Sequence, residues 1–118
     1  MSISQTYLNT GTISTTEISL PNVATYSSAN SITTDGVYQI FIDVNALASG
    51  DEFQFKVYEA VLNNVGSQRV IYQANLAGPQ SPPVLVIPSL ILTNFWDVTA
   101  KKISGTDRIL GWSIRQVI

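Results

Sequence analysis

The clearest pattern along the chain is an alternation of apolar and polar residues with a period of two, which becomes regular after the turn signal Asp35-Gly36. Because the apolar positions are rich in β-branched and aromatic residues, the alternation predicts half-buried strands. No window follows the helical period. We therefore predict an all-β protein: a single antiparallel β-sandwich, jelly-roll-like, with six to eight short strands.

Two hairpins follow from the same pattern. The first pairs 52–62 with 69–76, and the second pairs 95–103 with 109–118 around Thr106. In the second, Ala100 faces Trp112 on the inner side, and small against large is a favourable cross-strand pair. The residues expected to be largely buried are Tyr38, Ile40, Ile42, Phe53, Phe55, Val57, Val70, Tyr72, Val98, Trp112 and Ile114.

The N-terminal segment differs from the rest in being polar and rich in Ser and Thr. We interpret residues 1–16 as an extended arm or a loose first strand, with a frayed terminus as the alternative, and residues 17–118 as the sandwich domain. On the arm interpretation, deletion of residues 2–12 leaves a folded sandwich. The segment lacks the positive and apolar regions of a signal peptide, so we expect synthesis in a cytoplasm without secretion.

Charge is scarce. Only 12% of the 118 residues are charged, against about a quarter in a typical domain, and the net charge is −2. A surface with so few charges is typical of a protein that is covered by neighbouring subunits, either its own copies or another protein. The six basic residues are scattered, so no nucleic-acid partner is expected. The longest apolar stretch, Val84 to Leu92, is too short to span a bilayer, so no membrane partner is expected.

The chain has no histidine and no cysteine, which removes imidazole and thiolate chemistry and the usual zinc ligands. Glu59 is the one carboxylate on the apolar side of its strand, where we expect it opposite Tyr72. A lone acid favours a structural role over catalysis. Oxygen ligands for calcium cluster in one loop, but the same residues are typical of turns; these are Asp43, Asn45, Ser49, Asp51 and Glu52. We predict no catalytic residue, no cofactor and no metal.

The aromatic residues divide between the two faces of their strands. Trp96 and Trp112 occupy apolar positions, so core packing is favoured over a sugar-binding platform. Phe41 and Phe95 occupy the opposite positions and indicate an interface patch. The residues expected to bind a partner are Ile3, Tyr7, Leu8, Ile13, Phe41, Phe95, Pro82 and Pro83.

Two segments carry a resemblance to a known group of proteins. The run GVYQIFIDVNALASGDEFQFKVYEAV (36–61) closes one strand in DVNALASGD and ends the next near VYE. The tail FWDVTAKKISGTDRILGWSIRQV (95–117) forms the terminal hairpin motif. Together they resemble small β-rich proteins encoded among the virion genes of tailed bacteriophages. These motifs are structural and include no catalytic residue.

The resemblance implies a non-enzymatic virion structural protein. Its simplest form is a capsid decoration (cement) protein, which binds the outer surface of the major capsid protein lattice and stabilises the head. Such proteins often sit as trimers at local symmetry axes, so the implied partners are the major capsid protein, copies of this chain, or both. The alternative is a head-fibre or tail adhesion module that binds a host glycan.

Overall fold

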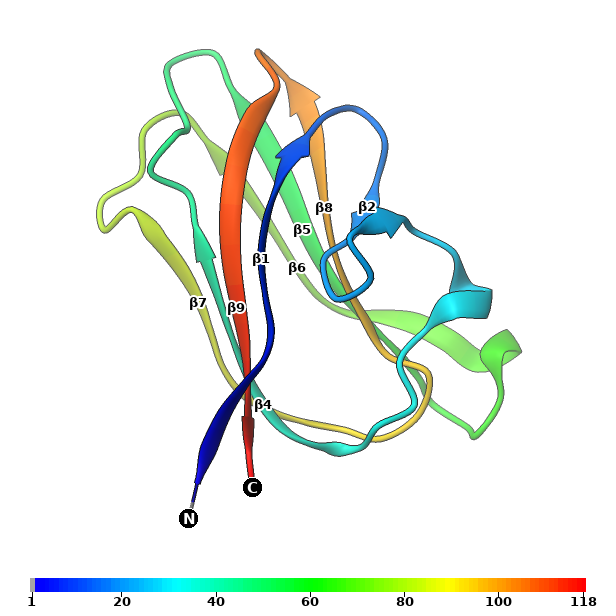
Figure 1. Ribbon diagram of the computed structural model, residues 1–118. Coiled ribbons are helices and arrows are strands. Elements are labelled where there is room, and N and C mark those ends of the chain that lie inside the picture. The colour runs from blue at the N-terminus through cyan, green and yellow to red at the C-terminus, as the bar shows by residue number, and fades with distance from the viewer. Residues whose placement is uncertain (1) are drawn as a thin grey trace.

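The structure is a computed structural model that describes residues 2–118. These residues form nine strands and two short 3-10 helices (Figure 1). The strands are β1 (Ile3–Ile13), β2 (Ile18–Ser19), β3 (Ala24–Thr25), β4 (Gly36–Asp43), β5 (Glu52–Ala60), β6 (Gln68–Ala77), β7 (Val84–Leu92), β8 (Asp97–Ser104) and β9 (Arg108–Val117); the helices are η1 (Ser28–Asn30) and η2 (Val65–Ser67).

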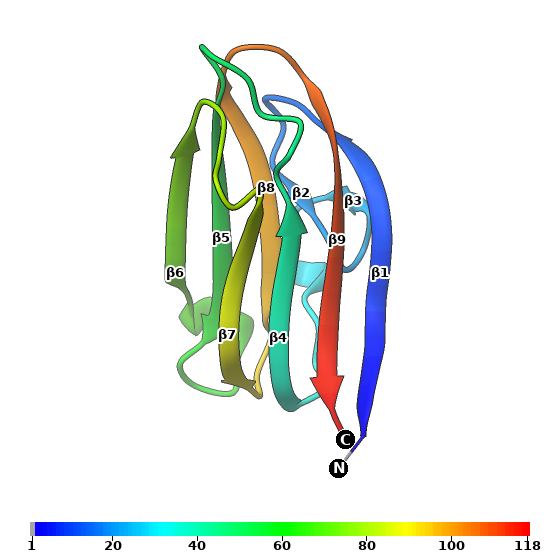
Figure 2. The ribbon, with the colours of Figure 1, turned by 90° about the vertical axis from the view of Figure 1, so that its left-hand side faces the viewer.

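The strands make two antiparallel sheets that face each other (Figure 2). The first sheet has the order β1-β9-β4-β7, and the second has the order β3-β2-β8-β5-β6. Apart from the two-residue strand β3, this is the order of the eight-stranded jelly roll, in which successive strands cross repeatedly between the sheets. The predicted fold class is therefore confirmed.

The predicted hairpin of the last two strands is wrong. β8 pairs with β2 and β5, whereas β9 pairs with β1 and β4 in the other sheet. Ala100 lies opposite Ile18 and Phe55, and Trp112 lies opposite Asn9 and Ile42. Alternation reports which face of a strand is buried, but a turn between two strands does not report whether they share a sheet.

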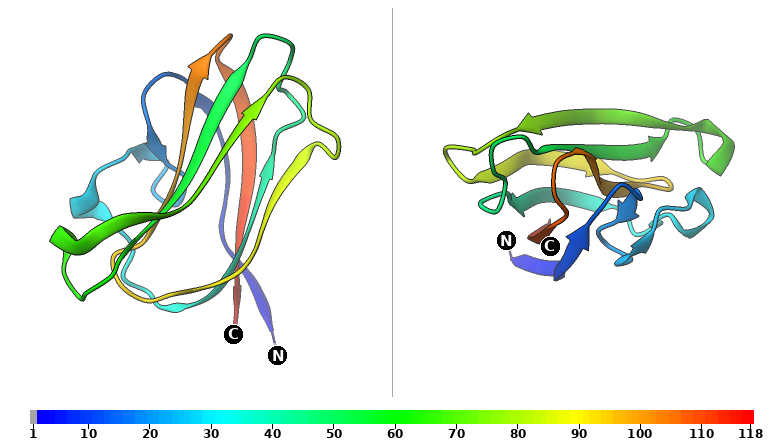
Figure 3. Two further views of the ribbon diagram at one scale, coloured as in Figure 1. Left: turned by 180° about the vertical axis from the view of Figure 1, so that it is seen from behind. Right: turned by 90° about the horizontal axis from the view of Figure 1, so that it is seen from above.

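Of the interpretations of residues 1–16, the extended arm is wrong and the first strand is correct, because residues 3–13 are strand β1 of the sandwich. β1 pairs with β9 from Ile3 opposite Val117 to Ile13 opposite Arg108, with one irregularity between Ser4 and Tyr7. The main chains of Ser2 and Ile118 also bond to each other, at 3.1 and 2.7 Å, so the two ends lie side by side (Figure 3). The boundary expected at residue 16 does not separate an arm from the domain.

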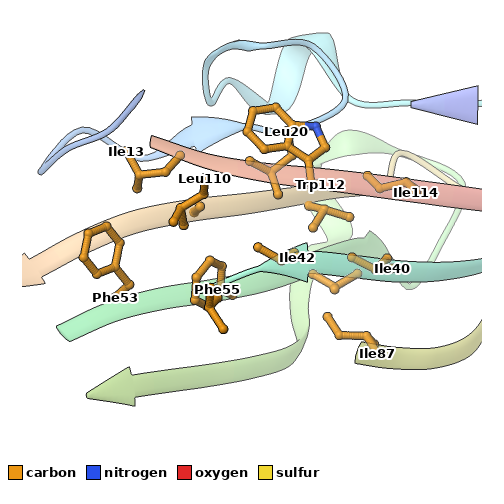
Figure 4. Packing of buried hydrophobic residues seen from close by; sticks show 14 of the residues in the cluster. Ile13, Leu20, Ile40, Ile42, Phe53, Phe55, Ile87, Leu110, Trp112 and Ile114 are labelled. Atoms are coloured by element: carbon orange, nitrogen blue, oxygen red, sulfur yellow. The ribbon is translucent and has the colours of Figure 1, made fainter. Parts of the chain in front are cut away.

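The core lies between the two sheets, where Figure 4 shows side chains from both layers meeting. Of the eleven residues predicted to be buried, nine have at most 3% of their surface exposed. Tyr72 is half-buried against the core, and Val70 is 42% exposed, so the prediction for Val70 is wrong. Trp96 and Trp112 are both core residues, as predicted.

Strand β7 has no counterpart among the predicted strands, because its residues are apolar except for Ser89, do not alternate with polar ones and include Pro88. It lies at the edge of its sheet, where a residue without an N–H is tolerated. The register with β4 shifts between Tyr38 and Ile40, opposite the stretch that contains Pro88. The irregularity lets one proline interrupt the ladder without ending the strand.

Candidate binding surfaces

The outer face of the first sheet is hollowed into a groove of about 560 Å³. The hollow follows from two small residues on the outer side of β9, Gly111 and Ser113. Ser113 lies between Leu8 of β1 and Phe41 of β4 in one row across the strands. Since the middle strand presents almost no side chain there while its neighbours present large ones, the surface sinks along β9.

Arg115 continues the outer face of β9 and is held in place on two sides. Its guanidinium carbon lies 3.9 Å from the centre of the Phe41 ring, a cation–π arrangement. Its Nε donates to Ser113 Oγ at 3.2 Å, and Ser113 Oγ donates to Gln5 Oε1 at 3.1 Å. Arg115 lines the groove, and among residues 2–118 no acidic side chain forms an ion pair with it, so its charge has no counter-charge from the protein.

The opposite end of the groove carries a negative charge. Asp43 lies opposite Gly111, four residues along β9 from Arg115, which is about 13 Å at the rise of a strand. Asp43 is exposed and accepts the N–H of Asn45 at 2.9 Å. Neutral amides of Gln5, Asn9 and Asn45 also line the groove. The groove therefore has a cation at one end, a carboxylate at the other and neutral polar groups beside an apolar floor.

A second surface is the side of the sandwich where β6 and β7, edge strands of different sheets, lie near each other (Figure 2). Five large apolar side chains are exposed on these two strands. Val84 on β7 lines the groove. We call the other four the β6–β7 edge: Val70 and Ile71 on β6, and Val86 and Ile91 on β7. Ile91 is the most exposed, at 76%. Residues 70–96 contain no Asp, Glu, Lys or Arg, so no charge interrupts this surface.

The few charged residues of the protein are nearly absent from the edges of its two sheets. The sheets end in four edge strands, β1, β7, β3 and β6, and within residues 2–118 these strands carry a single charged residue, Arg69. Of the other thirteen charged residues, nine lie on the central strands and four lie in the connecting segments. Proteins that stay monomeric normally guard their edge strands with charges, because the free N–H and C=O groups there can pair with another chain.

The structure brings three of the predicted partner-binding residues together. Leu8, Phe41 and Pro83 all line the groove on the first sheet. Two others are corrected: Ile13 is fully buried in the core, and Tyr7 faces inward, where its ring meets that of Trp96 edge-on at 5.9 Å. The alternation in β1 is displaced by its irregularity, which explains why the sequence did not separate inward from outward positions.

The remaining three predicted partner residues lie apart from the groove. Ile3, at one end of β1, and Pro82, in the loop before β7, are exposed. Phe95 is half-buried in the loop before β8, with a positive φ of 44°. Its carbonyl accepts a hydrogen bond from Gln68 Nε2 at 2.7 Å, so this residue joins a loop to the second sheet.

A buried acidic cluster lies on the outer side of β8, and nothing in the sequence analysis predicted it. Asp97 is fully buried; its Oδ1 accepts Ser19 Oγ at 2.7 Å and the N–H of Val98 at 2.8 Å. Asp97 Oδ2 has no hydrogen-bond partner. Burial raises the pKa of Asp97 to about 6, opposed by these hydrogen bonds, and the charge of Glu17 raises it further. Because Asp97 has no exposed surface, no substrate reaches it.

Glu17 stands beside Asp97 in a network of hydroxyl groups. Its Oε2 accepts Thr99 Oγ1 at 2.6 Å and the hydroxyl of Tyr58 at 2.8 Å. The Tyr26 ring stacks on Tyr58 with 4.6 Å between ring centres. Burial, and then the hydrogen bond to Glu17, raise the pKa of the Tyr58 hydroxyl. These contacts hold residues 17–26 against strands β5 and β8 of the second sheet.

The loop considered for calcium is a structural junction. Asp51 is buried; its Oδ2 accepts Arg108 Nε at 2.8 Å and the N–H of Ala48 at 2.9 Å, and its Oδ1 accepts the N–H of Thr106 at 3.1 Å. These bonds tie the start of β5 to the β8–β9 connection. The hydrogen bond from Arg108 is the main cause of a pKa of about 2 for Asp51. Within residues 2–118, no group of three or more His, Cys, Asp or Glu side chains could hold a metal ion.

Gly105 completes this junction. Its φ of +94° belongs to the region that favours glycine, and a Cβ there would collide with Asp51. The β8–β9 connection therefore approaches the carboxylate closely only because residue 105 has no side chain.

Glu59, the other acid considered, anchors a loop. Its Oε2 accepts the N–H of Thr93 at 2.5 Å, the hydroxyl of Thr93 at 3.1 Å and the N–H of Asn94 at 3.3 Å. The β5–β6 hairpin exists as predicted, but a shift between Val57 and Tyr58 places Glu59 opposite Arg69. The expected pairing of Glu59 with Tyr72 is therefore wrong.

Comparisons with known protein families, with curated proteins and with solved structures found no match to this chain. None of the helices in residues 2–118 is long and apolar enough to cross a membrane. The candidate surfaces therefore rest on their own geometry, namely the groove on the first sheet and the β6–β7 edge.

Proposed function

We propose that the protein is a non-enzymatic virion structural protein of the capsid-decoration type, which attaches to the outer surface of a capsid lattice through the β6–β7 edge. The observation that carries the proposal is the distribution of charge. Four edge strands share one charged residue, and two of them, β6 and β7, expose Val70, Ile71, Val86 and Ile91. Apolar surface of this kind is stabilised when a partner subunit covers it.

Two further observations support this role. The sequence resembles small β-rich virion proteins of tailed bacteriophages over residues 36–61 and 95–117. The jelly roll is also a common fold of viral capsid proteins, although it occurs in lectins as well. The sequence offered Asp51 and Glu59 for chemistry, and in the structure Asp51 is buried and Glu59 anchors a loop, so both carboxylates have structural roles.

The test is binding to purified DNA-filled heads that lack the protein, measured by co-sedimentation. Ile91→Lys places a charge on the β6–β7 edge, and Ile109→Lys places the same charge on β9, where Ile109 is 69% exposed. We expect Ile91→Lys to abolish binding and Ile109→Lys to leave it unchanged. Equal binding by the wild type and both variants would overturn attachment through this edge, and no binding by the wild type would overturn the decoration role.

A second candidate function is glycan binding by an adhesion module, and the groove on the first sheet favours it. The groove places Phe41 among amide side chains and a charged residue at each end. Apolar surface with a few convergent polar groups is typical of small-molecule sites. The same head-binding assay separates the two functions at Ile91, because Ile91 is not among the residues that line the groove.

A further inference from the structure

We infer that the groove on the outer face of the first sheet binds an acidic oligosaccharide and that Arg115 holds a carboxylate of the ligand. This inference rests on the second candidate function and names its ligand class. The ring contact of Arg115 with Phe41 and its Nε bond to Ser113 fix the plane of the guanidinium. Little side-chain freedom therefore remains to be lost on binding.

The unpaired positive charge of the Arg115 guanidinium favours a negatively charged ligand. Nε is already engaged by Ser113, and among the described residues no carboxylate is paired with the terminal nitrogens. Two parallel N–H donors match the two oxygens of a carboxylate. A neutral ligand would leave this charge without a counter-charge inside the groove.

The rest of the groove selects a sugar over an acidic peptide. Asp43, at the opposite end, is a strong acceptor for hydroxyl groups and would repel a second carboxylate. The amides of Gln5, Asn9 and Asn45 offer both donors and acceptors. A chain that bears a carboxylate on one unit and hydroxyls on the next satisfies both ends, whereas a run of acidic side chains brings negative charge against Asp43.

The experiment is isothermal titration calorimetry on the full chain. The acidic probes are trigalacturonate and sialyllactose, and the neutral counterparts are the methyl ester of trigalacturonate and lactose. Triglutamate tests an acidic peptide. We expect at least one acidic sugar to bind, with its neutral counterpart and triglutamate about tenfold weaker or worse, because one charge-assisted bidentate contact is lost or opposed.

Two variants assign the contact to one residue. Arg115→Gln should weaken acidic-sugar binding about tenfold or more and remove most of the preference for the acidic sugar over its neutral counterpart. Arg69→Gln removes a cation from β6, far from the groove lining, and should change neither. Both variants should keep the circular dichroism spectrum of the wild type.

The outcomes separate the inference from the function on which it rests. Equal binding of acidic and neutral sugars overturns the role of Arg115 but retains glycan binding. Binding of triglutamate as strong as that of the acidic sugars overturns the sugar in favour of an acidic peptide. Absence of binding by every sugar overturns both the inference and the second candidate function.

Discussion

Replacement of Asp97 by Asn tests the buried acidic cluster. The folded state raises the pKa of Asp97 from 3.8 to about 6, so it favours the protonated, neutral form. The contribution of this group to stability is therefore complete below about pH 4 and is lost as the pH rises through 6. Asn is neutral at every pH and retains the oxygen that accepts from Ser19 and Val98.

The size of the effect follows from that interval. At about 1.4 kcal/mol for each pKa unit, the interval from 3.8 to about 6 corresponds to about 3 kcal/mol of unfolding free energy. The titratable groups close enough to interact electrostatically with Asp97 are Glu17 and the phenols of Tyr7, Tyr26 and Tyr58. None of them supplies a positive charge that would offset the buried carboxylate.

The assay is urea unfolding of the wild type and Asp97→Asn between pH 3.5 and pH 8. We expect the difference in unfolding free energy between variant and wild type to shift by about 3 kcal/mol in favour of the variant across this range. Asp35→Asn, which removes a carboxylate at an exposed position, reports the loss of one negative charge alone. A difference between Asp97→Asn and the wild type that stays constant with pH would refute the reasoning.

Three further predictions concern the framework of the sandwich. Trp112→Ala should cost about 3–5 kcal/mol in urea unfolding, because the indole is 3% exposed in the core; a loss below about 1 kcal/mol would contradict its burial. Asp51→Asn should destabilise the protein at pH 6. It should also flatten the loss of unfolding free energy between pH 4 and pH 2, since the lowered pKa of Asp51 makes its contribution present above 3.8 and lost toward about 2. A loss of unfolding free energy between pH 4 and pH 2 equal to that of the wild type would refute this. Deletion of residues 3–13 should abolish cooperative thermal unfolding, because β9 would lose one of its two partner strands and the core would lose Ile13, and an unchanged melting curve would restore the arm interpretation.

Strands whose inner faces are strongly apolar could be predicted from the sequence. In β4 and β5 the buried residues, such as Ile40 and Phe55, alternate with less buried residues that are mostly polar, Phe41 being an exception, and the pattern identified both the strands and their inner faces. The sequence pattern did not establish β1 as a strand of the sandwich, because its Ser and Thr side chains point outward or lie along an edge. Its pairing with β9 is what makes it a strand. Local pattern carries little information about a pairing between residues about a hundred positions apart.

The candidate surfaces were only partly visible for a related reason. The sequence selected Leu8, Phe41 and Pro83, which the groove unites. It did not select Arg115, because its role depends on a ring from another strand. The signal that could have revealed the hollow was the outward pair Gly111 and Ser113, but small residues sink a surface only when their neighbours across the sheet are large.

Asp97 shows a different limit. Alternation correctly places it on the face of β8 opposite Val98, and such a position normally meets solvent. Here Ser19, Tyr26 and their neighbours around β2 and β3 cover that face. The covering segment contains no regular alternation, so its position over β8 could be found only from the three-dimensional arrangement.

The pairing of β1 with β9 has a consequence for folding during synthesis. Thr12 lies opposite Ile109 and Ile3 opposite Val117, so the ribosome makes β1 about a hundred residues before its only partner strand. At about 5–20 residues per second, β1 waits about 5–20 seconds without a partner. An uncharged strand rich in Ser and Thr can remain hydrated during that interval, whereas a strand of the β7 type would expose a continuous apolar ladder to other nascent chains. The polar composition of β1 thus allows this strand to stay hydrated and unpaired until β9 has been synthesised.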